Sequence, residues 1–232
     1  MLAKERILIG WEWYQHDNKE ELGLERLLLR TTRTVRTSRR LRDILLGDLN
    51  GDILSWKGAS RTKRYYDSLN SERWEDLLAI LRVGRRDPRR AVQEIVQFSQ
   101  RVMWYEPKHG KRKRGGIGFP VASAIAFFFS AGNCPVVDWR AVYALRQESY
   151  GEELPGIDLF KRTDGRGYQL STDDKGWEQY FDLCTEVVRQ LHVPRLAGDT
   201  RLRVLDKALW MSVPAVYGGR SKEIHARKRP PQ

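Results

Sequence analysis

A long uncharged stretch in the middle of a highly charged chain constrains the fold most. No charged residue lies between Arg114 and Asp138, whereas 31% of the whole chain is charged. Glycines begin this stretch and a Gly-Asn-Cys-Pro segment ends it, and such residues interrupt helices. The continuous apolar part, residues 119–131, would be roughly 20 Å long as a helix, which is less than the ~30 Å hydrocarbon core of a bilayer. We therefore expect a buried core helix rather than a membrane span.

The charge balance indicates a polyanionic partner. The 232 residues include 42 Lys and Arg against 30 Asp and Glu, a net charge of +12. Such an excess favours nucleic acid before a membrane surface. The 41% of apolar residues excludes a disordered polyanion-binding tail, and the length fits one large domain or two lobes.

Cysteine and histidine usage argues against metal centres. The two cysteines, Cys134 and Cys184, exclude a disulfide scaffold, a cysteine-ligated iron–sulfur cluster and a four-cysteine zinc site. The four histidines are scattered without ligand spacing. We expect no metal, no cofactor and two buried thiols. The N-terminal residues are too charged for a signal peptide, so a bacterial-type, nucleoid-associated cytoplasmic protein is expected.

Apolar spacing predicts an all-α chain. Asn70 or Ser71 and the Asp87-Pro88 pair are typical helix starts. A strand around residues 7–13, a small hairpin at Thr163–Gly165 and a disordered basic tail at 218–232 are the expected exceptions. The expected helices include residues 20–46, 74–81, 92–98, 119–131, 139–148, 177–193 and 202–213.

The polar side of residues 20–46 is basic, with arginines at three- and four-residue steps. This stripe fits either a DNA contact or a solvated helix face.

A glycine-rich turn precedes the apolar helix. Glycines allow a tight turn and a close approach of the backbone to a ligand, and amides near a helix N-terminus favour a phosphate. Ile117 would anchor the turn in the core. Basic residues before the turn would add attraction to a nucleic-acid backbone, although a surface turn beside a solvated basic run also fits. The candidate backbone-binding residues are Lys111, Arg112, Lys113, Arg114, Gly116, Gly118 and Phe119.

Asp138 follows the apolar helix and precedes another amphipathic one. An aspartate in that position is usually an N-cap. The combination of a Gly-Ile-Gly turn, a helix and then Pro-Val-Val-Asp is much rarer than any of its parts.

In these residues, Gly116–Ala122 and Pro135–Asp138 with the helix that follows, the chain resembles the helix-hairpin-helix (HhH-GPD, endonuclease III-like) DNA glycosylases. The resemblance implies a two-lobed helical fold with a central DNA-binding cleft. One lobe would span residues 30–131, and the other would combine 1–29 with 132–217. The resemblance also implies that Asp138 is the catalytic carboxylate, that the hairpin binds phosphate and that the target base is flipped out. Trp210 looks like part of the closing helix of some members.

Two departures define the implied chemistry. Pro120 stands where bifunctional members carry a nucleophilic lysine, and the four-cysteine cluster of several members is missing. The resemblance therefore implies a monofunctional enzyme without β-lyase activity, which hydrolyses the N-glycosidic bond in double-stranded DNA and leaves an abasic site. We expect the chain to act as a monomer.

The substrate base stays open between a damaged purine, in repair, and a bulky modified cytosine of phage DNA, in antiphage defence. The alternative is a noncatalytic helix-hairpin-helix DNA-binding protein. The residues that could stack on or replace a base, unless they only pack in the core, are Phe119, Trp139, Trp104, Tyr105 and Trp56.

Overall fold

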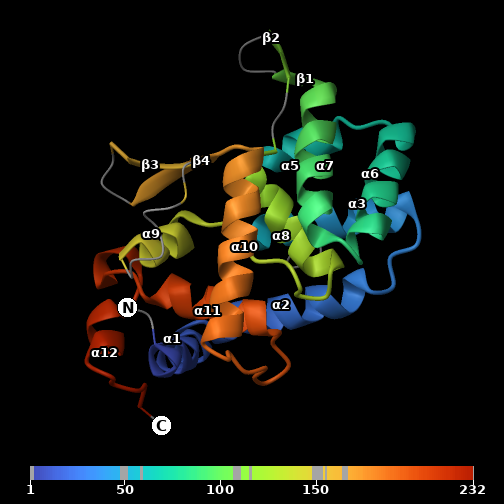
Figure 1. The fold of residues 1–232 in the computed structure, drawn as a ribbon. Coiled ribbons are helices and arrows are strands. Elements are labelled where there is room, and N and C mark those ends of the chain that lie inside the picture. Colours follow the sequence, from blue (N-terminus) through green and yellow to red (C-terminus); the bar gives the residue numbers. More distant parts are fainter. Residues whose placement is uncertain are drawn as a thin grey trace. The chain divides into compact units, whose positions relative to one another are not determined.

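The chain is mostly helical (Figure 1). A computed structural model describes residues 3–47, 52–57, 60–106, 111–114, 117–147, 154, 156–163 and 167–231. For residues 60, 61, 103–106 and 111–114 it describes the backbone alone. Within these ranges, no helix combines the length and the apolar character that crossing a bilayer requires.

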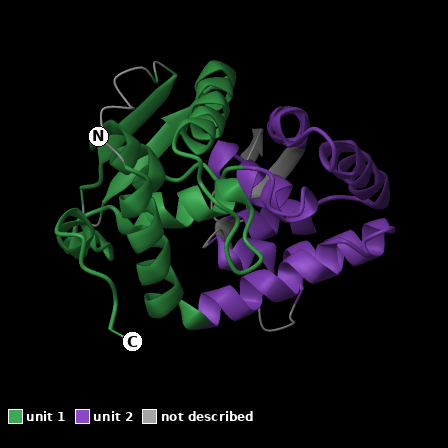
Figure 2. Cartoon of the chain, turned by 60° about the horizontal axis from the view of Figure 1, so that its bottom comes forward, with its two compact units in different colours: residues 1–19, 135–232 green, residues 20–134 purple. Residues whose placement is uncertain are grey.

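The chain forms two compact units (Figure 2). Unit 1 combines residues 1–19 with residues 135–232, and unit 2 is residues 20–134. The expected division placed the continuous lobe at 30–131, so unit 2 begins earlier and ends slightly later than expected.

Unit 2 is built around one apolar helix. Its elements are α2 (Lys19–Thr32, of which Lys19 belongs to unit 1), α3 (Ser38–Leu46), α4 (Ile53–Trp56), α5 (Ser60–Asp67), α6 (Ser71–Gly84), α7 (Pro88–Arg101), β1 (Met103–Glu106), β2 (Lys111–Arg114) and α8 (Phe119–Phe129).

Helix α8 lies in the core of unit 2, where α4, α6 and α7 contact it. Phe127 and Phe128 are at most 1% exposed. The Thr32 hydroxyl donates to the Phe128 carbonyl at 2.9 Å and so links α2 to α8. The apolar part of the uncharged stretch therefore forms a buried core helix as expected, although the helix ends at Phe129 rather than at residue 131.

Unit 1 gathers both ends of the chain. Its elements are α1 (Lys4–Asp17), α9 (Trp139–Gln147), β3 (Ile157–Lys161), β4 (Tyr168–Thr172), α10 (Asp174–Gln190), α11 (Arg201–Met211), the 3₁₀ helix η1 (Ala215–Tyr217) and α12 (Ser221–His225).

Helix α11 lies in the core of unit 1, where α1, α9 and α10 contact it. Its residues from Arg203 to Leu209 are all buried, including two basic side chains and one acidic one. Strands β3 and β4 pair antiparallel, which confirms the expected hairpin on either side of Thr163, and β4 contacts α9 and α10.

The helix starts expected from the sequence are confirmed. The Asn70 side chain accepts from the Arg73 amide, and the Asp87 side chain accepts from the Arg90 amide directly before Pro88. Each side chain satisfies an N–H group that the first helical turn leaves without a partner.

The strand expected around residues 7–13 is wrong, because these residues lie within α1. A Cβ atom on Gly10 would lie 3.1 Å from the backbone of Ala208, so α1 and α11 cross closely. Ile7 and Ile9 are buried in this unit. Their β-branched side chains favour a strand locally, but helix packing overrides that preference.

The expectation of a disordered tail at 218–232 is also wrong for its described part. Ile224 of α12 is 2% exposed, and the Trp13 indole donates to the Lys228 carbonyl at 2.9 Å. Arg220 pairs with Asp17, and Arg229 pairs with Glu12. The basic residues of the tail thus meet acidic residues of α1.

Candidate functional site

Asp138 is the N-cap of α9 in unit 1. Its Oδ1 atom accepts from the Arg140 amide at 3.0 Å, and its carbonyl accepts from the Val142 amide at 3.0 Å. The residue is half-buried. Hydrogen bonds from helix-terminal amides stabilise the anionic carboxylate and fix its rotamer.

The segment before Asp138 is rigidly packed. Val136 and Val137 are 3% and 0% exposed, and the Tyr180 hydroxyl of α10 donates to the Val136 carbonyl at 3.2 Å. Burial, and after it the neighbouring Cys184 and Asp206, raises the pKa of Tyr180 well above its usual value. The hydroxyl therefore keeps its proton and donates at neutral pH, which holds the Pro-Val-Val segment in place.

Arg140 lies against two indole rings. Its guanidinium carbon is 4.0 Å from the ring centre of Trp210 and 4.9 Å from that of Trp139, and its Nε atom donates to the Tyr217 carbonyl at 3.1 Å. Cation–π contacts of this kind favour the flat guanidinium of arginine. Arg140 thus links the start of α9 to α11 and η1.

Four half-buried aromatic side chains form a group beside α9: Trp139, Tyr143, Tyr168 and Tyr217. Trp139 meets Tyr217 edge to face at 5.4 Å, and Tyr143 lies 5.4 Å from Tyr168. Burial, and then the neighbouring tyrosine hydroxyls, raises the pKa of Tyr168.

Trp139 is held by its neighbours rather than extended into solvent. Gly167 has a φ of +106°, and a Cβ atom there would lie 2.7 Å from the Trp139 ring. Only glycine fits both that backbone conformation and that space. The position therefore supports a packing role for Trp139 more directly than a base-stacking role.

A buried ionic group joins α1 to α11. Arg203 pairs with Asp206 and also donates to the Tyr14 hydroxyl at 3.3 Å. Lys207, which is 1% exposed, donates to both oxygens of Asp199 at 2.9 and 2.8 Å. Buried charges persist when they are paired in this way.

The described part of the glycine turn lies in unit 2. Ile117 is 4% exposed, and its amide donates to the buried Ser99 hydroxyl at 3.1 Å, so Ile117 anchors the turn in the core as expected. Gly118 is exposed and caps α8 through its carbonyl, which accepts from the Val121 and Ala122 amides. Gly116 lies outside the described residues.

The remaining residues named from the sequence are distributed over unit 2. Phe119 is 5% exposed and packs in the core, and the half-buried Trp56 stacks on the core residue Phe127 at 6.0 Å. Trp104 and Tyr105 lie on β1 opposite Lys113 and Arg112 of β2. The structure describes only the backbone of both strands, so these side chains and those of Lys111 and Arg114 lie outside the described part of the chain. The sequence of these two strands does not alternate between apolar and polar residues, so it gave no signal for a strand pair.

The structure brings Asp138 and Trp139 together in unit 1, while the glycine turn and the basic strand belong to unit 2. Sequence reasoning missed Arg140 and Tyr180. The position of Arg140, two residues after the N-cap, was an available signal, whereas Tyr180 gave none because it comes from a distant helix.

The thiols of Cys134 and Cys184 are buried, as expected, and burial raises the pKa of Cys184. In the described ranges, no three His, Cys, Asp or Glu side chains are grouped as ligands of a metal ion would be. Comparison with protein-family models, with curated proteins and with solved structures gave no match for this chain.

Proposed function

We propose that the chain is a monofunctional DNA glycosylase of the helix-hairpin-helix type, with units 1 and 2 as the two lobes of that fold. The observation that carries the proposal is the half-buried Asp138 carboxylate, fixed at the start of α9 behind a buried Pro-Val-Val segment. The anchored Ile117-Gly118 turn at the start of α8 supports it.

The proposed reaction breaks the bond between C1′ of the deoxyribose and a base nitrogen. The bonding electrons leave with the base, and positive charge develops on the sugar. The Asp138 carboxylate stabilises that charge and accepts a proton as water adds to C1′. The departing base takes up one proton from solvent, and Asp138 returns to solvent the proton that it accepted from water. One water molecule therefore yields the free neutral base and an abasic site, and the carboxylate is regenerated.

Mass spectrometry of the bases released from a panel of duplex DNAs tests this proposal. The panel contains alkylated purines, oxidised purines and bulky modified cytosines, beside unmodified DNA. Release from at least one modified duplex, with none from unmodified DNA, is the expected result. The class of base released then separates a role in repair from a role in defence.

The second candidate is a noncatalytic DNA-binding protein. The hydrogen bond from the Arg140 amide favours it, because N-capping alone accounts for an aspartate at position 138. This candidate prevails if the chain binds duplex DNA and releases no base from any member of the panel.

Borohydride should not trap a covalent complex between the enzyme and DNA. Pro120 is the second residue of α8 and carries no amine, so it cannot form the imine that borohydride reduces. Denaturing gel electrophoresis after incubation with substrate and borohydride measures trapping. Efficient trapping would show that another amine attacks C1′, and would contradict the water mechanism.

Gly118→Ala should weaken DNA binding without unfolding the protein. Gly118 has an extended φ of −92°, and a Cβ atom would meet only Pro120 Cδ at 3.6 Å, so the fold itself accepts alanine. We expect a stability change below about 1 kcal/mol. A phosphate that approaches the backbone would meet the added methyl group, so affinity should fall severalfold in an anisotropy titration. Unchanged affinity would remove Gly118 from the DNA contact.

A further inference from the structure

Three arginines of unit 2 gather around the turn between α2 and α3. The Arg85 guanidinium donates to the carbonyls of Thr32 and Val35, at 3.1 and 3.3 Å. Arg82 donates to the Arg36 carbonyl at 2.5 Å. Arg36 donates to the carbonyls of Arg33 and Val35, both at 3.0 Å. We name Arg36, Arg82 and Arg85 the arginine cluster; residues 32–36 hold all three guanidinium groups in place.

The partners of the arginine cluster do not neutralise its charge. Backbone carbonyls accept hydrogen bonds but carry no net charge. Among the described residues, no carboxylate lies within ion-pairing distance of the cluster, whereas other arginines of the same unit are paired, including Arg42 with Asp67 and Arg90 with Glu94.

The three charges also repel one another. Burial, and then the charges of Arg36 and Arg82, lowers the pKa of Arg85. Like charges held together in this way are stabilised by a bound anion. The cluster therefore has both the fixed geometry and the unbalanced charge that an anion site requires.

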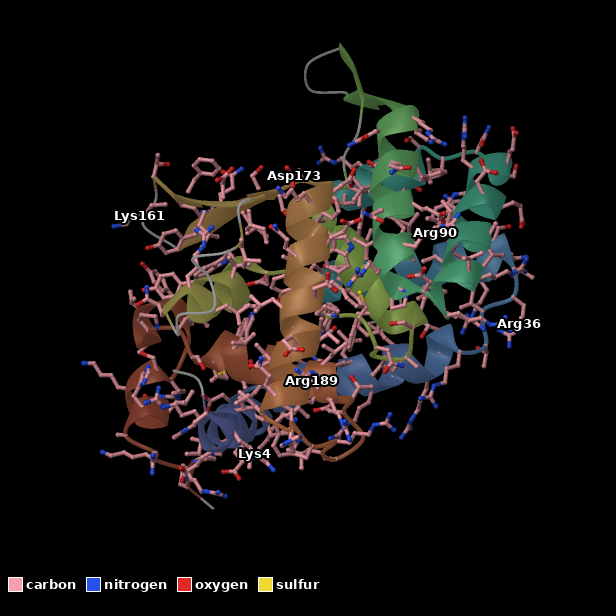
Figure 3. The ribbon with its side chains drawn as sticks, in the orientation of Figure 1. Lys4, Arg36, Arg90, Lys161, Asp173 and Arg189 are labelled. Carbon is pink, nitrogen blue, oxygen red and sulfur yellow. The ribbon has the colours of Figure 1, made fainter. Side chains whose placement is uncertain are left out.

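The surroundings extend the positive charge along the surface. The α2–α3 segment also carries the exposed Arg33, Arg39 and Arg40, and exposed Arg86 follows Arg85. The one acidic residue of the segment 82–87 is Asp87, and its side chain already serves as the N-cap of α7. Figure 3 labels Arg36 on the loop that follows α2.

A structural role is clearest for one member of the cluster. Arg85 is half-buried and donates to the last carbonyl of α2, as basic groups at helix C-termini do. Arg36 and Arg82 are exposed and bond to carbonyls of the turn itself. Exposed guanidinium groups fixed without a counter-charge are typical of phosphate-binding surfaces, because their planar N–H pairs match phosphate oxygens.

We propose that the arginine cluster is a second DNA contact of unit 2, at which Arg36 and Arg82 bind the phosphodiester backbone of duplex DNA without reading its sequence. It is separate in sequence from the basic strand and glycine turn at residues 111–118. The inference needs no base excision, so it stands or fails independently of the proposed catalysis.

The salt dependence of DNA binding tests this inference. The double variant Arg36→Gln/Arg82→Gln is titrated with a fluorescent, unmodified duplex at several salt concentrations. The slope of log affinity against log salt is negative, and each lost phosphate contact reduces its magnitude by about 0.9. We therefore expect the magnitude to fall by about 1.8, with weaker binding at every salt concentration. Arg85 is left intact because its side chain supports the end of α2.

The matched control is Arg90→Gln/Arg189→Gln, which removes the same charge from two exposed arginines that are paired with Glu94 and Glu186. Its salt slope should equal that of the wild type, and thermal melting should show both double variants folded. An unchanged slope in the cluster variant, or equal decreases in both variants, overturns the proposal.

Vesicles of phosphatidylserine and phosphatidylcholine form a third arm. If the wild type binds them, and the cluster variant loses that binding but keeps its affinity for duplex DNA, the cluster is a lipid-headgroup site and the DNA assignment is wrong. Loss confined to duplex DNA supports the proposal.

Discussion

Asp138→Asn should lower the rate of base release by at least about a hundredfold, the scale expected when a group that stabilises transition-state charge is removed. Asparagine is as good an N-cap as aspartate, so its side-chain oxygen can still accept from the Arg140 amide. The fold and the DNA affinity should therefore remain, and only the negative charge is lost. Quantified release of the free base under single-turnover conditions measures the effect.

The matched control is Asp173→Asn. Asp173 caps α10 in the same unit by accepting from the Gly176 amide at 2.7 Å, so the substitution removes an N-cap charge of the same kind. Base release should match the wild type. If Asp138→Asn still releases the base, the carboxylate is not the stabilising group. If both variants lose activity together, the loss follows from removing a helix-start charge in general and not from the position of Asp138. Either result contradicts the mechanism.

Local sequence signals located the helices well because capping and apolar spacing act within a few residues. Asn70 and Asp87 begin α6 and α7 as their side chains indicate. The same reasoning placed Asp138 at the start of α9, because Pro-Val-Val-Asp before an amphipathic pattern marks a helix start. What such signals cannot decide is whether the capping carboxylate has a second role.

The misjudged parts depend on partners that are distant in sequence. Residues 7–13 form a helix because α11 packs on them through Gly10 and Ala208. The described part of the tail, residues 218–231, packs on unit 1 because its arginines pair with acidic residues of α1. Likewise, the basic stripe of residues 20–46 became a defined surface only when Arg82 and Arg85 of the α6 end were placed beside Arg36. No window along the sequence contains these pairs.

Asp206→Ala should destabilise the protein by about 3–5 kcal/mol, the range for breaking a buried ion pair from one side. The side chains of Arg203 and Asp206 are 6% and 7% exposed, so the substitution leaves a guanidinium buried without this carboxylate. Chemical denaturation monitored by tryptophan fluorescence measures the loss. Because α11 lies in the core of unit 1, where α1, α9 and α10 contact it, we expect unfolding of unit 1 rather than fraying of one helix.

The comparison pair is Glu186 with Arg189 on α10. It has the same three-residue spacing in a helix, but its side chains are 43% and 73% exposed. Solvent screens such pairs, so Glu186→Ala should leave the free energy of unfolding nearly unchanged. The double variant Arg203→Met/Asp206→Leu should recover much of the lost stability, because it removes both buried charges and keeps similar volume. If Asp206→Ala lowers the free energy of unfolding no more than Glu186→Ala does, the buried pair on α11 adds nothing to stability. The stability of unit 1 then rests on its apolar contacts alone.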